Sequence, residues 1–258
     1  MKLPGGALVR LLALIGHALW GVAVTALAPS GALSNSAGGQ RIVRFWHRGV
    51  LAILGIRLKA MGKPLEAPVL IVANHISWVD IAALGALCPG HFVAKLEIEA
   101  WPVIGWLARQ AGTYFIQRGD RTASAGVAQR MTEAFLDHQS VLLFPEGTST
   151  DGREVRPFHA RLFAAAIEAN CPVQPVVLGY PDTRGGIHPA APFIGEDTLV
   201  NHLWRLLRAR GEFTVEVRFL APELPTGLSA RTLANRAHDV IAAHHGGMQG
   251  APADGLSE

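Results

Sequence analysis

Cysteine is scarce in this chain. The 258 residues contain only Cys88 and Cys171, which lie in apolar contexts without a Cys-x-x-Cys partner. Such a chain lacks the material for a disulfide framework, and the two thiols indicate a reduced compartment. Outside the motifs described below, the histidines show no spacing with cysteine or acidic residues that is typical of a metal site. We therefore expect no metal ion and no bound cofactor.

Other familiar signatures are also missing. There is no internal repeat and no basic motif interleaved with aromatic residues, and the formal net charge is only +3, so nucleic acid is not an expected partner. The Gly-x-Ser-x-Gly elbow is absent around Ser149, which argues against a serine hydrolase.

Charge is absent from residues 11–28, which contain no Lys, Arg, Asp or Glu. A membrane-spanning helix needs about 20 apolar residues, so this segment is just long enough. A cleaved signal peptide is the rival interpretation, because Lys2 and Arg10 precede the segment and Ala26-Leu27-Ala28 has the form of a cleavage site. Pro29 would follow that cut and disfavours processing, so we expect an uncleaved membrane anchor.

Residues 40–61 form a second apolar segment that carries basic residues. Arg41, Arg44 and Arg48 recur at helical spacing among aliphatic and aromatic residues. A basic helix of this kind suits the plane of an anionic bilayer, although an amphipathic helix packed on the core has the same pattern. A span and a helical hairpin in one leaflet both remain possible.

These features predict three parts. Residues 1–62 would be membrane-anchoring helices, residues 63–245 an α/β domain, and residues 246–258 a disordered tail. We expect the protein at the inner (cytoplasmic) membrane, with the catalytic domain facing the cytoplasm.

Short apolar runs alternate with helical patterns after residue 62, which indicates a mixed, mostly parallel sheet flanked by helices. The predicted strands cover residues 69–73, 92–94, 114–116, 141–144, 173–178 and 213–220. The predicted helices cover residues 78–87, 101–110, 122–138, 161–169, 198–209 and 229–244.

Two motifs follow predicted strands. His75 ends the first strand, and Asp80 lies five residues later. The two side chains can meet only if His75 lies in the turn and Asp80 in the first turn of the next helix, since residues five apart on one helix diverge by about 140°. Ser77 and Asp80 also have the form of a capping box, so a purely structural Asp80 is an alternative.

The second motif is Phe144-Pro145-Glu146-Gly147-Thr148, at the end of another apolar strand. Ligand sites of α/β sheets usually lie at this edge, although an acidic residue in a plain turn is equally common. The order of the two motifs resembles the glycerolipid acyltransferase family, whose best-known members are the bacterial 1-acyl-glycerol-3-phosphate acyltransferases. Weaker matches are the stretch 112–118, which ends in Arg118, and the stretch 173–177.

The resemblance implies a reaction and its substrates. His75 would act as general base on the acceptor hydroxyl, and Asp80 would hold the imidazole. The acyl donor would be acyl-CoA or acyl carrier protein, a co-substrate rather than a cofactor. The resemblance also implies that Glu146, Gly147, Thr148, Arg118 and Lys95 bind substrate, with Arg118 pairing with an anionic head group. A thioester hydrolase and a non-catalytic lipid-binding protein are the rival classes.

The chain departs from the family pattern at two cationic positions. Ser149 and His159 stand where many lysophosphatidate enzymes have arginine and lysine. A serine cannot replace a bidentate guanidinium. Lysophosphatidate or another lysophospholipid remains the first expectation for the acceptor, and phosphate-free lyso-ornithine lipid is the alternative.

Overall fold

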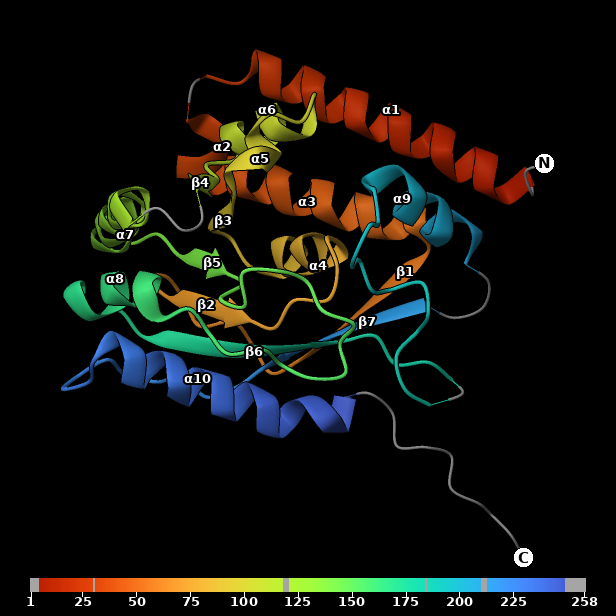
Figure 1. Ribbon diagram of the computed structural model, residues 1–258. Helices are drawn as coiled ribbons and strands as arrows, with labels where there is room; N and C mark the ends of the chain where they lie inside the picture. The colour runs from red at the N-terminus through yellow and green to blue at the C-terminus, as the bar shows by residue number, and fades with distance from the viewer. Residues whose placement is uncertain (1–4, 30, 118–120, 184, 210–212, 249–258) are drawn as a thin grey trace, which may run out of the picture.

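The computed structural model describes residues 5–29, 31–117, 121–183, 185–209 and 213–248. A seven-stranded sheet lies at its centre, with helices on both faces (Figure 1). The strand order is β1-β7-β6-β2-β5-β3-β4. The strands are β1 (Ile56–Met61), β2 (Leu70–Ala73), β3 (His91–Lys95), β4 (Tyr114–Ile116), β5 (Val141–Leu143), β6 (Val173–Gly179) and β7 (Phe213–Phe219).

The pairing is parallel throughout this sheet except between β6 and β7, which confirms the predicted mixed, mostly parallel sheet. Strands β2 and β5 lie beside each other near the middle, so the two motifs that follow them emerge at the same edge. This adjacency is what brings residues about 70 positions apart into one site.

The helices form two layers. On one face α3 and α4 pack on the sheet below α1 and α9, and on the other α8 and α10 cover it (Figure 1). The helices are α1 (Gly5–Leu27), α2 (Ala32–Asn35), α3 (Ala37–Leu54), α4 (Val79–Leu87), α5 (Leu96–Glu99), α6 (Ile104–Gln110), α7 (Arg121–Leu136), α8 (Phe163–Glu168), α9 (Leu199–Arg208) and α10 (Ala230–His245), with 3₁₀ turns η1 (Ala160–Leu162) and η2 (Gly246–Met248).

The two-residue period of a strand explains these layers. Ile71 and Ala73 of β2 point into the core beneath α3 and α4, whereas Leu70 and Val72 point into the core beneath α7, α8 and α10. All four residues of β2 are buried, as expected for a strand covered on both faces.

The second N-terminal segment differs from the prediction. The helix expected over residues 40–61 ends at Leu54, where Gly55 adopts a left-handed conformation (φ 73°) and closes the helix. Residues 56–61 then form β1, an edge strand that pairs with β7. Their sequence, Ile-Arg-Leu-Lys-Ala-Met, alternates apolar and basic residues, which is the period of a strand rather than of a helix.

The other predicted strands and helices of the α/β domain are present, with ends that differ from the prediction by at most three residues. Two short helices, α2 and α5, were not predicted, because four residues are too few to show a helical period. The expected disordered tail begins with the 3₁₀ turn η2, and its remaining residues lie outside the described part of the chain.

Candidate active site

His75 and Asp80 meet at the end of β2. The Nδ1 atom of His75 lies 2.9 Å from Oδ2 of Asp80. Asp80 is fully buried, whereas the His75 side chain is 17% exposed. The polypeptide achieves this contact as the prediction required, with His75 in the strand-to-helix turn and Asp80 in the first turn of α4.

Asp80 makes both kinds of contact expected of it, to the His75 imidazole and to the backbone at the start of α4. Its Oδ2 accepts hydrogen bonds from the backbone N–H groups of Ile76 (2.7 Å) and Ser77 (2.8 Å) as well as from the imidazole. The other oxygen, Oδ1, accepts from the hydroxyl of Tyr180 at 2.5 Å. Every one of these partners can donate, so the acceptor-only carboxylate is the form that satisfies them.

The hydrogen-bond pattern also selects a tautomer of His75. A carboxylate on the Nδ1 side holds the ring hydrogen there, which leaves the lone pair on Nε2. This nitrogen can then accept a proton from a hydroxyl group, and the buried carboxylate stabilises the imidazolium that results.

Tyr180 is a residue of the site that the motifs did not indicate. It follows β6 directly, and its ring is completely buried. Burial, together with the neighbouring Asp80 carboxylate, raises the pKa of Tyr180 well above its usual value. Tyr180 therefore keeps its proton and acts only as a donor to Asp80. A tyrosine at the end of an apolar strand was the only available signal.

Glu146 fixes the turn that carries His75. Its Oε1 accepts from the backbone N–H of His75 at 2.7 Å, and its Oε2 accepts from the backbone N–H of Arg156 at 2.9 Å. Burial raises the pKa of Glu146, although these two N–H groups favour the carboxylate. In the free protein both oxygens are thus committed to the backbone rather than directed toward a substrate.

The backbone carbonyl of His75 is anchored as well. It accepts from the backbone N–H of Thr150 at 2.9 Å and from the Thr150 hydroxyl at 3.2 Å. The ring of Phe144 stacks on the imidazole with a centroid distance of 4.2 Å and an interplanar angle of 20°. His75 is therefore held at its backbone, its Nδ1 atom and one ring face.

Asn74 completes the support from the sheet. Its side chain exchanges two hydrogen bonds with the backbone of Leu178, at 2.8 and 3.0 Å. This exchange ties the end of β2 to the end of β6, so the strand that precedes His75 cannot separate from the strand that precedes Tyr180.

The other residues predicted to bind substrate are not all part of this hydrogen-bond network. Gly147 adopts a left-handed φ of 75° at the Glu146 turn, and Thr148 beside it is exposed. Lys95 is 45% exposed and forms an ion pair with Glu97 at 3.0 Å. Arg118 lies outside the described residues. The structure thus gathers His75, Asp80, Glu146 and Gly147, but it does not bring Lys95 into their hydrogen-bond network.

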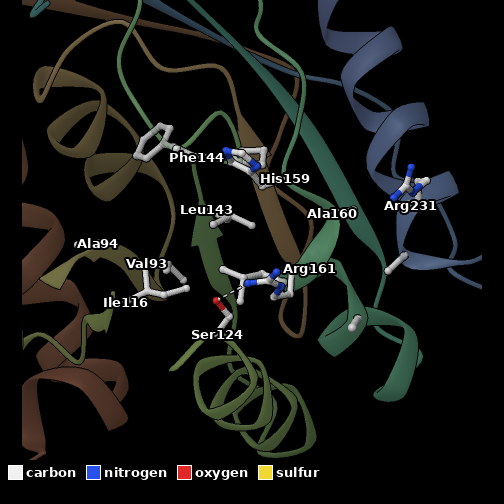
Figure 2. A pocket seen from close by; sticks show the side chains of 15 residues that line it. Val93, Ala94, Ile116, Ser124, Leu143, Phe144, His159, Ala160, Arg161 and Arg231 are labelled. Atoms are coloured by element: carbon white, nitrogen blue, oxygen red, sulfur yellow. Dashed lines mark hydrogen bonds between the residues drawn. The ribbon is translucent and has the colours of Figure 1, made fainter. Parts of the chain in front are cut away.

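A pocket of about 760 Å³ lies beside the Glu146 turn (Figure 2). Its walls come from β3, β4 and β5, from α7, η1 and α8, and from the start of α10. The lining residues are Val93, Ala94, Ile116, Ser124, Leu143, Phe144, Pro145, Gly147, His159, Ala160, Arg161, Leu162, Ala164, Ala230 and Arg231. His75 is not among these lining residues, but its ring stacks on that of Phe144, which is.

The two positions at which the family pattern is broken differ in their surroundings. The hydroxyl of Ser149 donates a short hydrogen bond to the backbone carbonyl of Phe193, so it is occupied within the protein. His159, in contrast, lines the pocket, and its ring lies near Phe144 (Figure 2).

Comparison with known proteins shows the class of enzyme to which this fold and this histidine–aspartate pair belong. The family model described as Acyltransferase matches residues 57–179. The chain is 44% identical to a lyso-ornithine lipid O-acyltransferase from Pseudomonas aeruginosa, over 78% of this chain and 77% of that protein. This protein therefore belongs to the acyltransferase family.

Other matches include enzymes named for glycerophosphate acceptors. A 1-acyl-sn-glycerol-3-phosphate acyltransferase from Neisseria meningitidis is 40% identical over 67% of this chain and 68% of the relative. The crystal structure of the 1-acyl-sn-glycerophosphate acyltransferase PlsC from Thermotoga maritima matches with a TM-score of 0.68 and 19% identity, covering 95% of each chain. At that identity the structural match establishes the shared fold alone.

Proposed function

We propose that this protein is a membrane-associated O-acyltransferase that acylates the hydroxyl of lyso-ornithine lipid. The single observation that carries this choice is the 44% identity to the enzyme of that name in Pseudomonas aeruginosa. The acceptor expected first from the sequence was lysophosphatidate, and the relatives favour the alternative instead. Ser149 gives independent support, because it stands at a position of phosphate-binding arginine and is bonded to Phe193.

The mechanism follows from the geometry of His75. Its Nε2 atom takes the proton of the acceptor hydroxyl, whose oxygen attacks the carbonyl carbon of an acyl thioester. A carbon–oxygen bond forms as the carbon–sulfur bond breaks, and the imidazolium returns the proton to the departing thiolate. No acyl-enzyme intermediate is required, so the reaction needs no nucleophilic serine or cysteine.

The N-terminal helices would place this chemistry at a membrane surface. Helix α1 is, among the described residues, the one helix long and apolar enough to cross a bilayer. It nevertheless lies along α3 and also contacts α6 and α9 (Figure 1). The outward face is apolar along its length, with Leu8, Leu12, Ile15 and Leu19 all exposed.

We infer that α1 lies in the plane of one leaflet rather than across the bilayer. His17 is the one histidine in this uncharged segment, and it supports a helix lying in the membrane plane because its side chain points toward α3. Its Nε2 atom lies 2.9 Å from the carbonyl oxygen of Trp46, and its ring stacks between Trp20 and Trp46. The apolar side is thus left to the lipid, which fits attachment at the cytoplasmic membrane.

An acceptor panel tests the proposed function. Purified protein in detergent is supplied with an acyl thioester and, in separate reactions, lyso-ornithine lipid, lysophosphatidate or no acceptor. We expect the diacylated ornithine lipid to form fastest, and His75→Ala to lower that rate by at least about 100-fold while the protein stays folded. Faster acylation of lysophosphatidate would refute the assignment, and thiol release without acceptor would indicate a hydrolase.

A further inference from the structure

The pocket beside Phe144 is lined by both aliphatic and cationic side chains. The aliphatic ones include Val93, Ile116, Leu143 and Leu162. Such a surface suits hydrocarbon, and the volume of about 760 Å³ is within the range of small-ligand sites. An apolar wall next to the catalytic turn is the place where the chain of a lysolipid gains most by leaving water.

The charged residues of the pocket carry one sign. Arg161 and Arg231 line the pocket together with His159, and no acidic residue appears among the described lining residues. A group of guanidinium ions with no carboxylate beside it favours an anionic group on the ligand. Since many of the other lining residues are apolar, that ligand should be an amphiphile rather than a highly charged nucleotide.

Arg161 is held in position by α7. Its Nη1 atom donates to the hydroxyl of Ser124 at 3.1 Å, and Ser124 is only 4% exposed (Figure 2). This bond anchors the guanidinium, which lines the pocket, through one of its donor groups. An arginine anchored in this way loses less side-chain entropy when it binds a carboxylate.

Arg231 also lines the pocket, although it comes from α10, near the C-terminal end of the domain. It lies in the first turn of α10, which packs against η1, the 3₁₀ turn that carries Arg161. Residue 231 is outside the segment 57–179 that the family model matches, so the family pattern assigns it no role. The tertiary structure alone puts it on the same pocket as Gly147.

We propose that Arg161 and Arg231 bind the anionic group of the acceptor head group, which in lyso-ornithine lipid is the ornithine carboxylate. This inference rests on the proposed function for the identity of that group. This carboxylate is attached to a hydrocarbon chain, which would lie against the aliphatic residues that line the same pocket.

The test compares variants that remove the positive charge but keep a polar side chain. Arg161→Gln and Arg231→Gln are assayed beside Arg236→Gln, a control on the same helix whose arginine pairs with Glu223 and does not line the pocket. The acceptors are lyso-ornithine lipid and its carboxamide analogue. We expect each pocket variant to raise KM for lyso-ornithine lipid by about 5- to 20-fold, with kcat and the donor KM within about twofold of wild type.

The carboxamide supplies a second, independent readout. Wild type and the Arg236→Gln control should prefer the acid over the amide, and this preference should collapse toward unity in the Arg161→Gln/Arg231→Gln double variant. Arg231→Lys should recover part of the preference, because it restores the charge without the planar fork. A rise in KM for the acyl thioester instead of the acceptor would assign the cations to donor phosphate and overturn the proposal.

The proposed function and this inference fail in different ways. If wild type acylates lysophosphatidate but not lyso-ornithine lipid, the proposed function is wrong. The variants are then assayed with lysophosphatidate, where an increased acceptor KM supports an anion-binding role for the two arginines. An acceptor KM that stays at the wild-type value in both variants, with whichever lysolipid is used, refutes the inference alone.

Discussion

At the scale of single residues, Asp80 links the His75 imidazole to the backbone. The carboxylate accepts hydrogen bonds from the His75 ring, two backbone N–H groups and the Tyr180 hydroxyl, with no solvent exposure. A buried charge is tolerated only when it is fully hydrogen-bonded, so each donor contributes both to folding and to the orientation of the imidazole. The carboxylate that accepts from the start of α4 therefore also holds the imidazole.

Removing one donor separates these contributions. Tyr180→Phe should lower the free energy of unfolding by about 1–3 kcal/mol, because a buried carboxylate oxygen loses its partner. We expect kcat to fall by up to about tenfold, since the imidazolium is then less firmly stabilised. Urea unfolding and steady-state kinetics measure the two effects.

Tyr114→Phe provides the matched control for that experiment. Tyr114 is the other tyrosine of the chain, and its hydroxyl takes part in none of the hydrogen bonds among the described residues. This variant should resemble wild type in both measurements. Equal losses in the two variants would mean that the Tyr180 hydroxyl has no special role.

At the scale of elements, the site is a junction of two strand ends. The turn after β5 supplies Glu146, which accepts from the backbone of the turn after β2. Thr150 then returns a hydrogen bond to the carbonyl of the same residue, His75. The two turns are thus joined by side chain and by backbone, and neither turn alone has a reason to adopt this shape.

The ionisation of Glu146 gives this junction a dependence on pH. Burial raises the pKa of Glu146 in the folded protein, so the folded state binds this proton more tightly than the unfolded chain does. The contribution of this group to stability is therefore greatest below the ordinary glutamate pKa and declines as pH rises through the raised value.

The Glu146→Gln variant removes the ionisable group. Its amide cannot accept from both backbone N–H groups, so we expect the free energy of unfolding to fall by about 1–3 kcal/mol. The difference in unfolding free energy, wild type minus variant, should decrease as pH rises across the interval between the two pKa values. Urea titrations at a series of pH values provide the measurement, and a difference that increases with pH would contradict the assigned direction.

At the scale of the whole molecule, the apolar outer face of α1 lies opposite α10 across the sheet (Figure 1). Exposed apolar residues continue from α1 onto α3, where Phe45 and Ile42 are also exposed. An apolar surface of this extent on one side of a molecule marks contact with a membrane or a partner. The domain itself is covered on both faces, so this side is the one available for attachment.

Charges placed on that face should release the protein from lipid. Leu12→Glu combined with Leu19→Glu removes two exposed apolar side chains, each worth about 1.5–3 kcal/mol when buried, so partitioning into anionic vesicles should fall by about 100-fold or more. Ala242→Glu with Ala243→Glu adds the same charge at exposed positions on α10. Vesicle sedimentation compares the two, and equal release by both pairs would show that net charge alone governs binding.

Most of the fold could be read from local patterns. The apolar runs that became β2, β5 and β6 are buried on both faces, so their periodicity survives in the sequence whatever surrounds them. β1 was assigned to a helix because its alternating stretch follows directly on the basic helix α3, and only pairing with β7 shows it to be a strand. An edge strand depends on a distant partner that local spacing does not reveal.

The amino-acid sequence by itself determined the chemistry: an imidazole and a carboxylate in one turn, followed by an acidic turn after a second strand. The tertiary structure decided how these groups act. It commits both Glu146 oxygens to the backbone, it supplies Tyr180 to Asp80, and it brings Arg231 to the pocket beside Gly147. The reason is that motifs record neighbours along the chain, whereas hydrogen-bond partners and pocket walls depend on which strands the sheet places side by side.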